Sequence, residues 1–202
     1  GTGRHSILLS KKGWRIVGLD LSRNLLTIAK RSMKDAGVDF PLVRGDMRRF
    51  PLRDQVFNGV ICMFTSFGYL PSEREDESSL REVWRTLQNG GKFLLDVANR
   101  DHLVKTFQER EWAEFEPFYL LEKRTLDLKH SRLLSEWTII RKNSGEVRKL
   151  QHKVRLYTLS KLERMLRKAG LRVTEVYGGY QKQEFDAEST RMIVLAEKSG
   201  SG

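Results

Sequence analysis

Two glycines and an aspartate near the start of the chain stand at a spacing that suits a nucleotide-like ligand. Gly1 and Gly3 lead into the apolar residues 7–9, which predict a helix beginning beside the glycines. Glycine lets backbone N–H groups approach a ligand closely, and a helix N-terminus presents unpaired N–H groups that suit an anionic group. The β-rich residues 14–20 follow and end in Asp20. Nucleotide-binding folds place a ribose-binding acid about 20 residues after such glycines, so Asp20 is a candidate for that role.

The elements that position these residues alternate between strand and helix. In chain order they are a helix opened by Ser22 and ended by Gly37, a strand over residues 40–44, an apolar strand over residues 56–64, a helix opened by Ser72 and ended at residues 89–91, and a strand over residues 92–98. The apolar run at 56–64 predicts a strand buried on both faces. The alternation predicts an α/β fold with a doubly wound, mostly parallel sheet, whose ligands bind at the carboxyl ends of the strands. Gly3, Asp20, Asp46 and residues 64–69 would then meet at one edge.

The pattern changes between residues 111 and 157. There the chain is aromatic and β-branched with alternation, and residues 142–146 carry a turn signal between two such runs. This pattern predicts an inserted antiparallel β layer. Two interpretations stay open: a lid over the ligand edge, or an extension of the sheet that does not contact substrate.

The end of the chain predicts a helix and two more strands. Ser160 and Glu163 form a capping-box pattern at the start of a helix that ends at Gly170, and residues 171–177 and 191–196 predict strands. The domain organisation predicted from these boundaries is an α/β core over residues 1–110, an inserted β lid over residues 111–157, a helix with the last two strands of the core over residues 158–198, and a flexible tail over residues 199–202.

The composition limits the classes of protein to which the chain can belong. Its 202 residues are 39% hydrophobic and 31% charged, as in a folded protein with one main core. No apolar run reaches the roughly 20 residues that span a bilayer, so no membrane partner is expected. Cys62 is the single cysteine and cannot form an internal disulfide, which predicts a reducing, cytoplasmic location. The spacing of the four histidines predicts no metal site.

Taken in order, several short motifs resemble those of the class I S-adenosylmethionine-dependent methyltransferases, over essentially the whole chain. The matching pieces are Gly1-Thr2-Gly3 for the end of the glycine-rich first motif, Asp20 for the ribose-binding acid, Gly45-Asp46-Met47 for the adenine-binding turn, residues 57–64 for the fourth-strand motif, and residues 87–93 for the turn before the fifth strand. The resemblance implies a seven-stranded sheet whose last strand runs antiparallel. The family's first strand, with its acidic residue before the glycines, has no counterpart in this sequence, so that strand is expected to be missing.

By the same resemblance the cofactor is S-adenosyl-L-methionine, and the residues that bind it can be named. They are Gly1 and Gly3 at its methionine part, Asp20 at the ribose with its neighbour Leu21, Asp46 and Met47 at the adenine, and Phe64 and Ser66 near the methyl group. The implied reaction is methyl transfer to a small-molecule acceptor by in-line displacement, which depends on alignment more than on catalytic side chains. No catalytic residue is therefore assigned. The candidates on the acceptor side are Tyr69, His152 and Tyr157.

Two other functions stay open. The net charge of +11 is compatible with an RNA- or protein-directed methyltransferase, although no basic cluster interleaved with aromatics is present. The expected absence of the first strand is compatible with a binding module that kept the fold without the activity. Residues 64–67 read Phe-Thr-Ser-Phe, not the Asn/Asp-Pro-Pro-aromatic tetrapeptide that points to methylation of base amino groups, and this favours a small molecule over nucleic acid. No motif indicates the acceptor or the oligomeric state.

Overall fold

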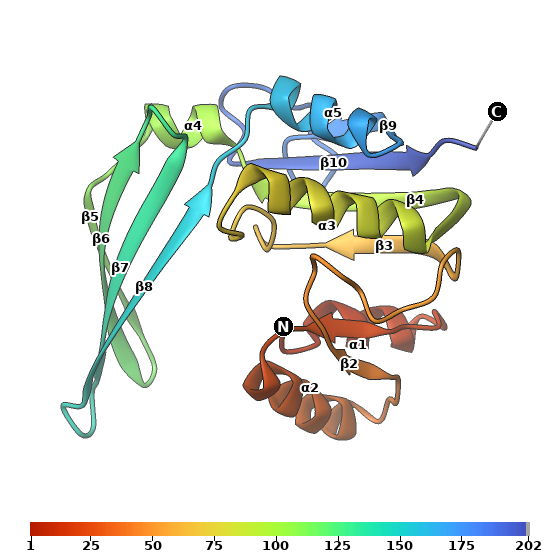
Figure 1. The fold of residues 1–202 in the computed structure, drawn as a ribbon. Helices are drawn as coiled ribbons and strands as arrows, with labels where there is room; N and C mark the ends of the chain where they lie inside the picture. Colours follow the sequence, from red (N-terminus) through yellow and green to blue (C-terminus); the bar gives the residue numbers. More distant parts are fainter. Residues whose placement is uncertain (201–202) are drawn as a thin grey trace. The chain divides into compact units, whose positions relative to one another are not determined.

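The computed structural model describes residues 1–200 and divides into two compact units, Gly1–Asp54 and Gln55–Gly202. Both contain helices and strands, as expected of an α/β fold (Figure 1). Residues 199–200 follow the last strand without regular structure, and the rest of the predicted tail, residues 201–202, lies outside the described residues.

The first unit is a small α/β arrangement built on two parallel strands. β1 pairs with β2 from Gly18 opposite Leu42 to Asp20 opposite Arg44. The predicted helix after Ser22 is confirmed: the Ser22 hydroxyl accepts a hydrogen bond from the N–H of Leu25 at 3.3 Å. Both strands are shorter than expected, because only the last three residues of each predicted run pair. The elements are α1 (Arg4–Lys11), β1 (Gly18–Asp20), α2 (Arg23–Ala36) and β2 (Leu42–Arg44).

The second unit contains a four-stranded sheet in the order β3-β4-β10-β9. β3 runs parallel to β4, whereas β10 runs antiparallel to both β4 and β9, which confirms the expectation of an antiparallel last strand. Helices α3 and α5 lie along this sheet, and their buried side chains form its core with those of β4 and β10 (Figure 1). The elements are β3 (Phe57–Cys62), α3 (Glu73–Thr86), β4 (Leu87–Ala98), α5 (Leu159–Lys168), β9 (Leu171–Tyr177) and β10 (Arg191–Lys198).

Three details of this unit differ from the sequence-based expectations. No residue of β3 is fully buried and Ile61 is 45% exposed, so the prediction of burial on both faces is wrong. β3 is also the edge strand of its sheet. α3 starts after Ser72 as predicted, and Ser72 and Glu75 form a capping box there. The helix ends at Thr86, before the predicted end at residues 89–91, because the fully buried Leu87 takes an extended conformation and begins β4 at once. The cap of α5 is Thr158 rather than Ser160.

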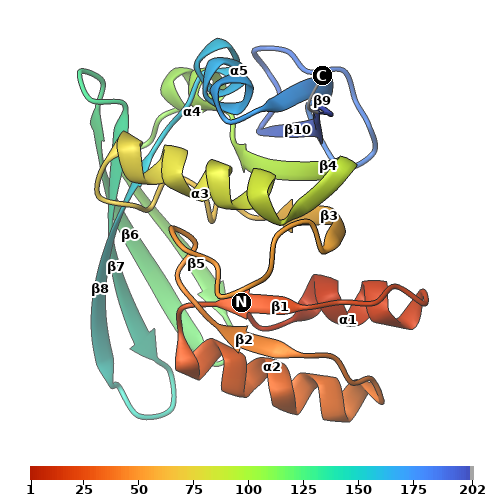
Figure 2. The same cartoon turned by 45° about the vertical axis from the view of Figure 1, so that its right-hand side comes forward.

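A separate antiparallel sheet follows β4 in the chain, in the order β5-β6-β7-β8. Successive hairpins connect its strands, and the predicted turn at residues 142–146 joins β7 to β8 (Figure 2). A short helix before it, which the sequence pattern did not predict, is capped by the Asn99 side chain. The elements are α4 (Arg100–Lys105), β5 (Arg110–Phe115), β6 (Phe118–Asp127), β7 (Arg132–Arg141) and β8 (Val147–Arg155).

Candidate functional site

The glycine turn of the first unit is fixed by close packing. Gly3 precedes α1 with a φ of 82°, in the left-handed region that favours glycine. A Cβ at Gly3 would lie 3.2 Å from the Cβ of Ala29 in α2, so this turn has no room for a larger residue without a shift. The amino group of Gly1 contacts the carboxylate of Asp20, so the structure brings the predicted glycines and the predicted ribose-binding acid together.

Asp20 and Asp46 stand on adjoining turns at the carboxyl ends of β1 and β2. The N–H of Gly45 donates to the carbonyl oxygen of Asp20 at 3.1 Å, which joins the two turns directly. The Asp20 carboxylate also accepts from the N–H of Ser22 at 2.7 Å. Leu21 is 62% exposed beside it. The structure therefore groups the acids predicted for the ribose and the adenine.

The Asp46 carboxylate is held in its ionised form by a neighbour that sequence reasoning did not single out. Arg48 donates to it from its backbone N–H at 2.9 Å and from its guanidinium at 2.6 Å. These hydrogen bonds lower the pKa of Asp46 below its ordinary value. A carboxylate has about four lone-pair positions, so Asp46 can accept a further hydrogen bond beside Arg48. Met47, predicted to pack on the adenine, is half-buried in this turn.

In the second unit, the loop after β3 has a strained backbone at Phe64 and Thr65. Their φ angles are 54° and 56°, which non-glycine residues adopt rarely. The N–H of Phe64 donates to the carboxylate of Asp96 at 2.9 Å. Phe64 is 49% exposed, and the exposed hydroxyl of Ser66 donates to the carbonyl oxygen of Met63 at 2.9 Å. Strain of this kind persists where the surrounding structure imposes it, and it clusters at functional sites.

Asp96 holds this loop and was not recognised from the sequence. It is fully buried in β4, and its carboxylate also accepts from the Tyr180 hydroxyl at 2.8 Å and from the Arg191 guanidinium at 2.7 Å. The Tyr180 ring lies 6.0 Å from the Phe64 ring, so the loop packs against the same cluster. The sequence did carry one signal for Asp96, which is a carboxylate inside the apolar run 93–98. A buried acid needs hydrogen-bond partners, so this position could have been singled out.

On the acceptor side, the structure brings Tyr69 and His152 together. Their ring centroids are 5.9 Å apart, and the Trp137 ring lies 4.6 Å from His152 in an edge-on contact. Burial raises the pKa of Tyr69 and lowers that of His152, and the negative charge of Glu122 acts on both. Sequence reasoning missed Trp137 and Glu122, because their position depends on the register of β6, β7 and β8.

Tyr157 lies elsewhere, in a buried cluster. Its hydroxyl donates to the Asp76 carboxylate at 2.7 Å, and the Arg155 guanidinium forms an ion pair with the same carboxylate. Burial and the adjacent carboxylate raise the pKa of Tyr157 well above its ordinary value. Only 3% of Tyr157 is exposed, so the structure does not group it with Tyr69 and His152.

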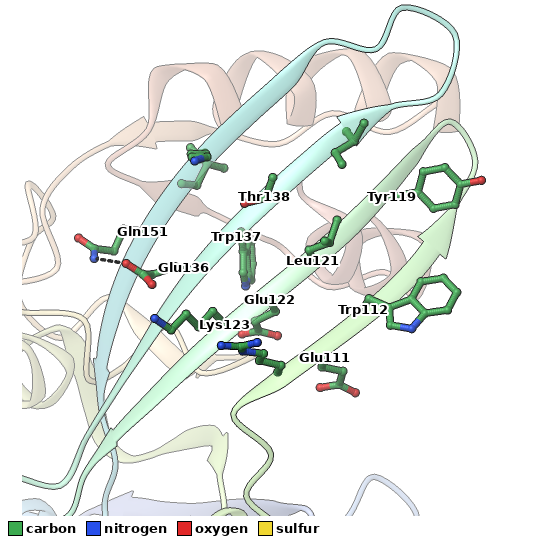
Figure 3. Close-up of a pocket in the computed structure, with 14 residues that line it drawn as sticks. Glu111, Trp112, Tyr119, Leu121, Glu122, Lys123, Glu136, Trp137, Thr138 and Gln151 are labelled. Atoms are coloured by element: carbon green, nitrogen blue, oxygen red, sulfur yellow. Dashed lines mark hydrogen bonds between the residues drawn. The ribbon is translucent and has the colours of Figure 1, made fainter.

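The β5–β8 sheet also bears a hollow of about 720 Å³, and Glu122 and Trp137 are among the residues that line it (Figure 3). Side chains that alternate along β5, β6 and β7 line it, among them Trp112, Leu121 and Thr138. Trp112 is 68% exposed, so this hollow is open to solvent.

Comparisons with known proteins indicate the family of the chain. A family described as methyltransferase domain matches residues 1–91. Over 98% of this chain and 80% of the relative, the sequence is 27% identical to the cypemycin N-terminal methyltransferase of Streptomyces sp.. A solved S-adenosylmethionine-dependent methyltransferase from Clostridium acetobutylicum ATCC 824 shares the fold with a TM-score of 0.89 at 17% identity, over 99% of this chain and 81% of that one.

These comparisons support a class I S-adenosylmethionine-dependent methyltransferase. The chain is a methyltransferase and therefore an enzyme. A local comparison gives 40% identity over 80 residues to the dTDP-3-amino-3,6-dideoxy-alpha-D-glucopyranose N,N-dimethyltransferase of Streptomyces fradiae, covering 40% of this chain and 29% of that protein.

Two features of the first unit are compatible with an adenosyl ligand. Gly3, with its φ of 82°, keeps the first turn in a left-handed conformation close against Ala29. Asp20 offers a partly exposed carboxylate whose side chain is 23% accessible, as hydrogen bonds to ribose hydroxyls require. Among residues 1–200, no cluster of histidines, cysteines and acids is suited to a metal ion, and no helix has the length and apolar character to cross a membrane.

Proposed function

We propose that this methyltransferase transfers a methyl group from S-adenosyl-L-methionine to a small-molecule acceptor by in-line displacement. The observation that carries the proposal is the direct hydrogen bond between the Asp20 and Gly45-Asp46 turns, 3.1 Å from the Gly45 nitrogen to the Asp20 carbonyl oxygen. The ribose and the adenine are adjacent parts of one ligand, and the two acids proposed to bind them stand on adjoining turns.

Each residue of the cofactor site has a proposed task. Backbone groups of Gly1 and Gly3 line the methionine part, and the Asp20 carboxylate accepts from both ribose hydroxyls beside Leu21. Asp46 accepts from the adenine amino group and Met47 packs on the ring. Phe64 and Ser66 shape the wall near the methyl group. The bound cofactor supplies a methyl group on a sulfonium with a good leaving group, so the chain contributes mainly alignment. The proposed cofactor-binding residues are therefore Gly1, Gly3, Asp20, Leu21, Asp46, Met47, Phe64 and Ser66.

The finer architecture is part of the same proposal. We assign β1, β2, β3, β4, β9 and β10 to a seven-stranded sheet of the methyltransferase type, of which the first strand is not in this sequence. The core then comprises residues 1–110 and 158–198, and residues 111–157 form a lid on the acceptor side. The single cysteine, Cys62, supports a cytoplasmic location.

The names of two relatives support a small acceptor that is methylated on nitrogen. One relative is named as the cypemycin N-terminal methyltransferase, and the other as the N,N-dimethyltransferase of a dTDP-linked amino sugar. Neither name refers to a nucleic acid.

Calorimetric titration with S-adenosylhomocysteine tests the cofactor site. The wild-type protein should bind, and Asp20→Ala should weaken binding by about 10- to 100-fold, because hydrogen bonds to a charged group contribute about 1.5–3 kcal/mol each. Asp35→Ala, an exposed acid on α2, is the matched control and should bind like the wild type. No binding by the wild-type protein would refute the proposal.

A further inference from the structure

Three side chains share one face of the β6–β8 part of the antiparallel sheet. Glu122 stands opposite Trp137 in the register, and His152 stands opposite Ser135, two residues before Trp137. Register partners lie side by side, and side chains two residues apart on a strand point the same way. Glu122, Trp137 and His152 therefore project from the same face, and Figure 3 shows Glu122 and Trp137 on neighbouring strands.

Tyr69 joins these residues from the loop after β3. Its ring contacts His152, which in turn contacts Trp137, so three rings form a row. The loop is tied to the sheet at the adjacent residue, where the N–H of Arg155 donates to the carbonyl oxygen of Gly68 at 2.8 Å. A Cβ at Gly68 would lie 2.5 Å from the Arg155 oxygen, so loop and strand meet too closely for another residue. Tyr69 is thus positioned firmly beside β8, and it is 47% exposed.

The hydrogen-bonding capacity of this face is not filled. Glu122 is half-buried, and within residues 1–200 its carboxylate has neither a hydrogen bond nor an ion pair. Other acids of the same sheet are paired: Glu111 with Arg124, and Glu114 with Lys142. The indole N–H of Trp137 and the hydroxyl of Ser135, which is 1% exposed, are buried without a partner in the described part of the chain. Unpaired polar groups of this kind are costly, and a ligand that satisfied them would be favoured.

We propose that Tyr69, Glu122, Trp137 and His152, here called the Glu122 cluster, bind the methyl acceptor as an organic ammonium ion. This proposal rests on the proposed function and names its acceptor class. The Glu122 carboxylate supplies the opposite charge that an ammonium group requires. The rings of Tyr69 and Trp137 supply the electron-rich faces to which such cations are attracted.

His152 has a defined task in this arrangement. An ammonium nitrogen has no lone pair, so it must lose a proton before it can form a bond to carbon. Burial lowers the pKa of His152, so the imidazole is neutral at pH 7 and can accept that proton. The step converts the bound ammonium into an amine and His152 into an imidazolium, and charge is conserved.

Titration by NMR with two matched probes, benzylammonium and benzyl alcohol, tests the proposal without requiring turnover. The indole N–H signal of Trp137, identified as the one lost in Trp137→Phe, should shift and saturate with benzylammonium at pH 7. The uncharged alcohol should bind at least about tenfold more weakly. Glu122→Gln should weaken benzylammonium binding by a similar factor. Glu136→Gln, beside Trp137 but on the opposite face, should leave it unchanged.

Equal binding of the alcohol and the ammonium, or an unchanged affinity in Glu122→Gln, would overturn the ammonium assignment. Calorimetry with S-adenosylhomocysteine on the same variants separates this result from the proposed function. Glu122→Gln should bind S-adenosylhomocysteine like the wild type, because Glu122 is outside the proposed cofactor residues. If the wild-type protein bound benzylammonium but not S-adenosylhomocysteine, the result would refute the proposed cofactor site and would still support an ammonium site at the Glu122 cluster.

Discussion

The carboxylate of Asp96 accepts a hydrogen bond from the backbone N–H of Phe64 at 2.9 Å, across 32 positions of sequence. This contact connects the C-terminal end of β4 to the loop that bears Phe64, Ser66 and Tyr69. The same carboxylate binds Tyr180 and Arg191, so one buried acid stabilises the strained conformation of the loop. The position of residues proposed for both cofactor and acceptor therefore depends on Asp96.

Removing that carboxylate should destabilise the second unit. We expect Asp96→Ala to lower the free energy of unfolding by about 3 kcal/mol, because the Phe64 N–H loses its acceptor and the Arg191 guanidinium loses the carboxylate that pairs with its charge. Denaturant unfolding followed by circular dichroism measures the loss. Glu163→Ala, an exposed position on α5, should change it by less than about 0.5 kcal/mol. A similar small change in Asp96→Ala would mean that other contacts hold the loop.

The histidine of the Glu122 cluster should titrate below its ordinary range. Burial lowers the pKa of His152 from 6.5, and the negative charge of Glu122 partly opposes the shift. The pKa measured by NMR should therefore be below 6.5 and should fall further in Glu122→Gln. Between the pKa of His152 in the folded protein and 6.5, the unfolded chain binds more protons at His152 than the folded chain does. The contribution of His152 to the free energy of unfolding should therefore decrease as the pH falls through this range. A pKa that rises in Glu122→Gln would contradict this placement of the two residues.

Tyr157 should matter for stability and not for ligand binding. Its hydroxyl donates to the buried Asp76 carboxylate, and the Asp76 Oδ1 atom is already buried without a partner. Tyr157→Phe should therefore lower the free energy of unfolding by about 1–3 kcal/mol. The affinities for S-adenosylhomocysteine and for benzylammonium should be unchanged. If the Tyr157→Phe protein folded but bound benzylammonium more weakly, the result would contradict a purely structural role and would indicate that Tyr157 takes part in acceptor binding.

Local signals allowed much of the fold to be predicted. Ser22 and Ser72 each determine a helix start through contacts within three residues, and both starts were predicted correctly. The start of α5 was placed two residues late, because Thr158 and Ser160 both carry a hydroxyl that can cap and only the backbone conformation selects Thr158.

The candidate site was predictable only where it is local in sequence or matches a family motif. Asp20 and Asp46 follow strand ends and could be named. Glu122 and Trp137 come together through the register of two strands, and Asp96 meets Tyr180 across 84 positions. Alternation along a strand shows which side chains share a face, but it does not identify the partner strand or the register.

The most direct test of the account is the dissociation constant of S-adenosylhomocysteine compared with that of its 2′-deoxyribose analogue, measured for the wild type and for Asp20→Ala. If Asp20 accepts hydrogen bonds from the ribose hydroxyls, the wild type should bind S-adenosylhomocysteine about tenfold or more tightly than the analogue, because a hydrogen bond to a carboxylate is lost. Asp20→Ala should bind both ligands with nearly the same affinity. Equal discrimination by the two proteins would contradict the assignment of Asp20 to the ribose, on which the cofactor site is built.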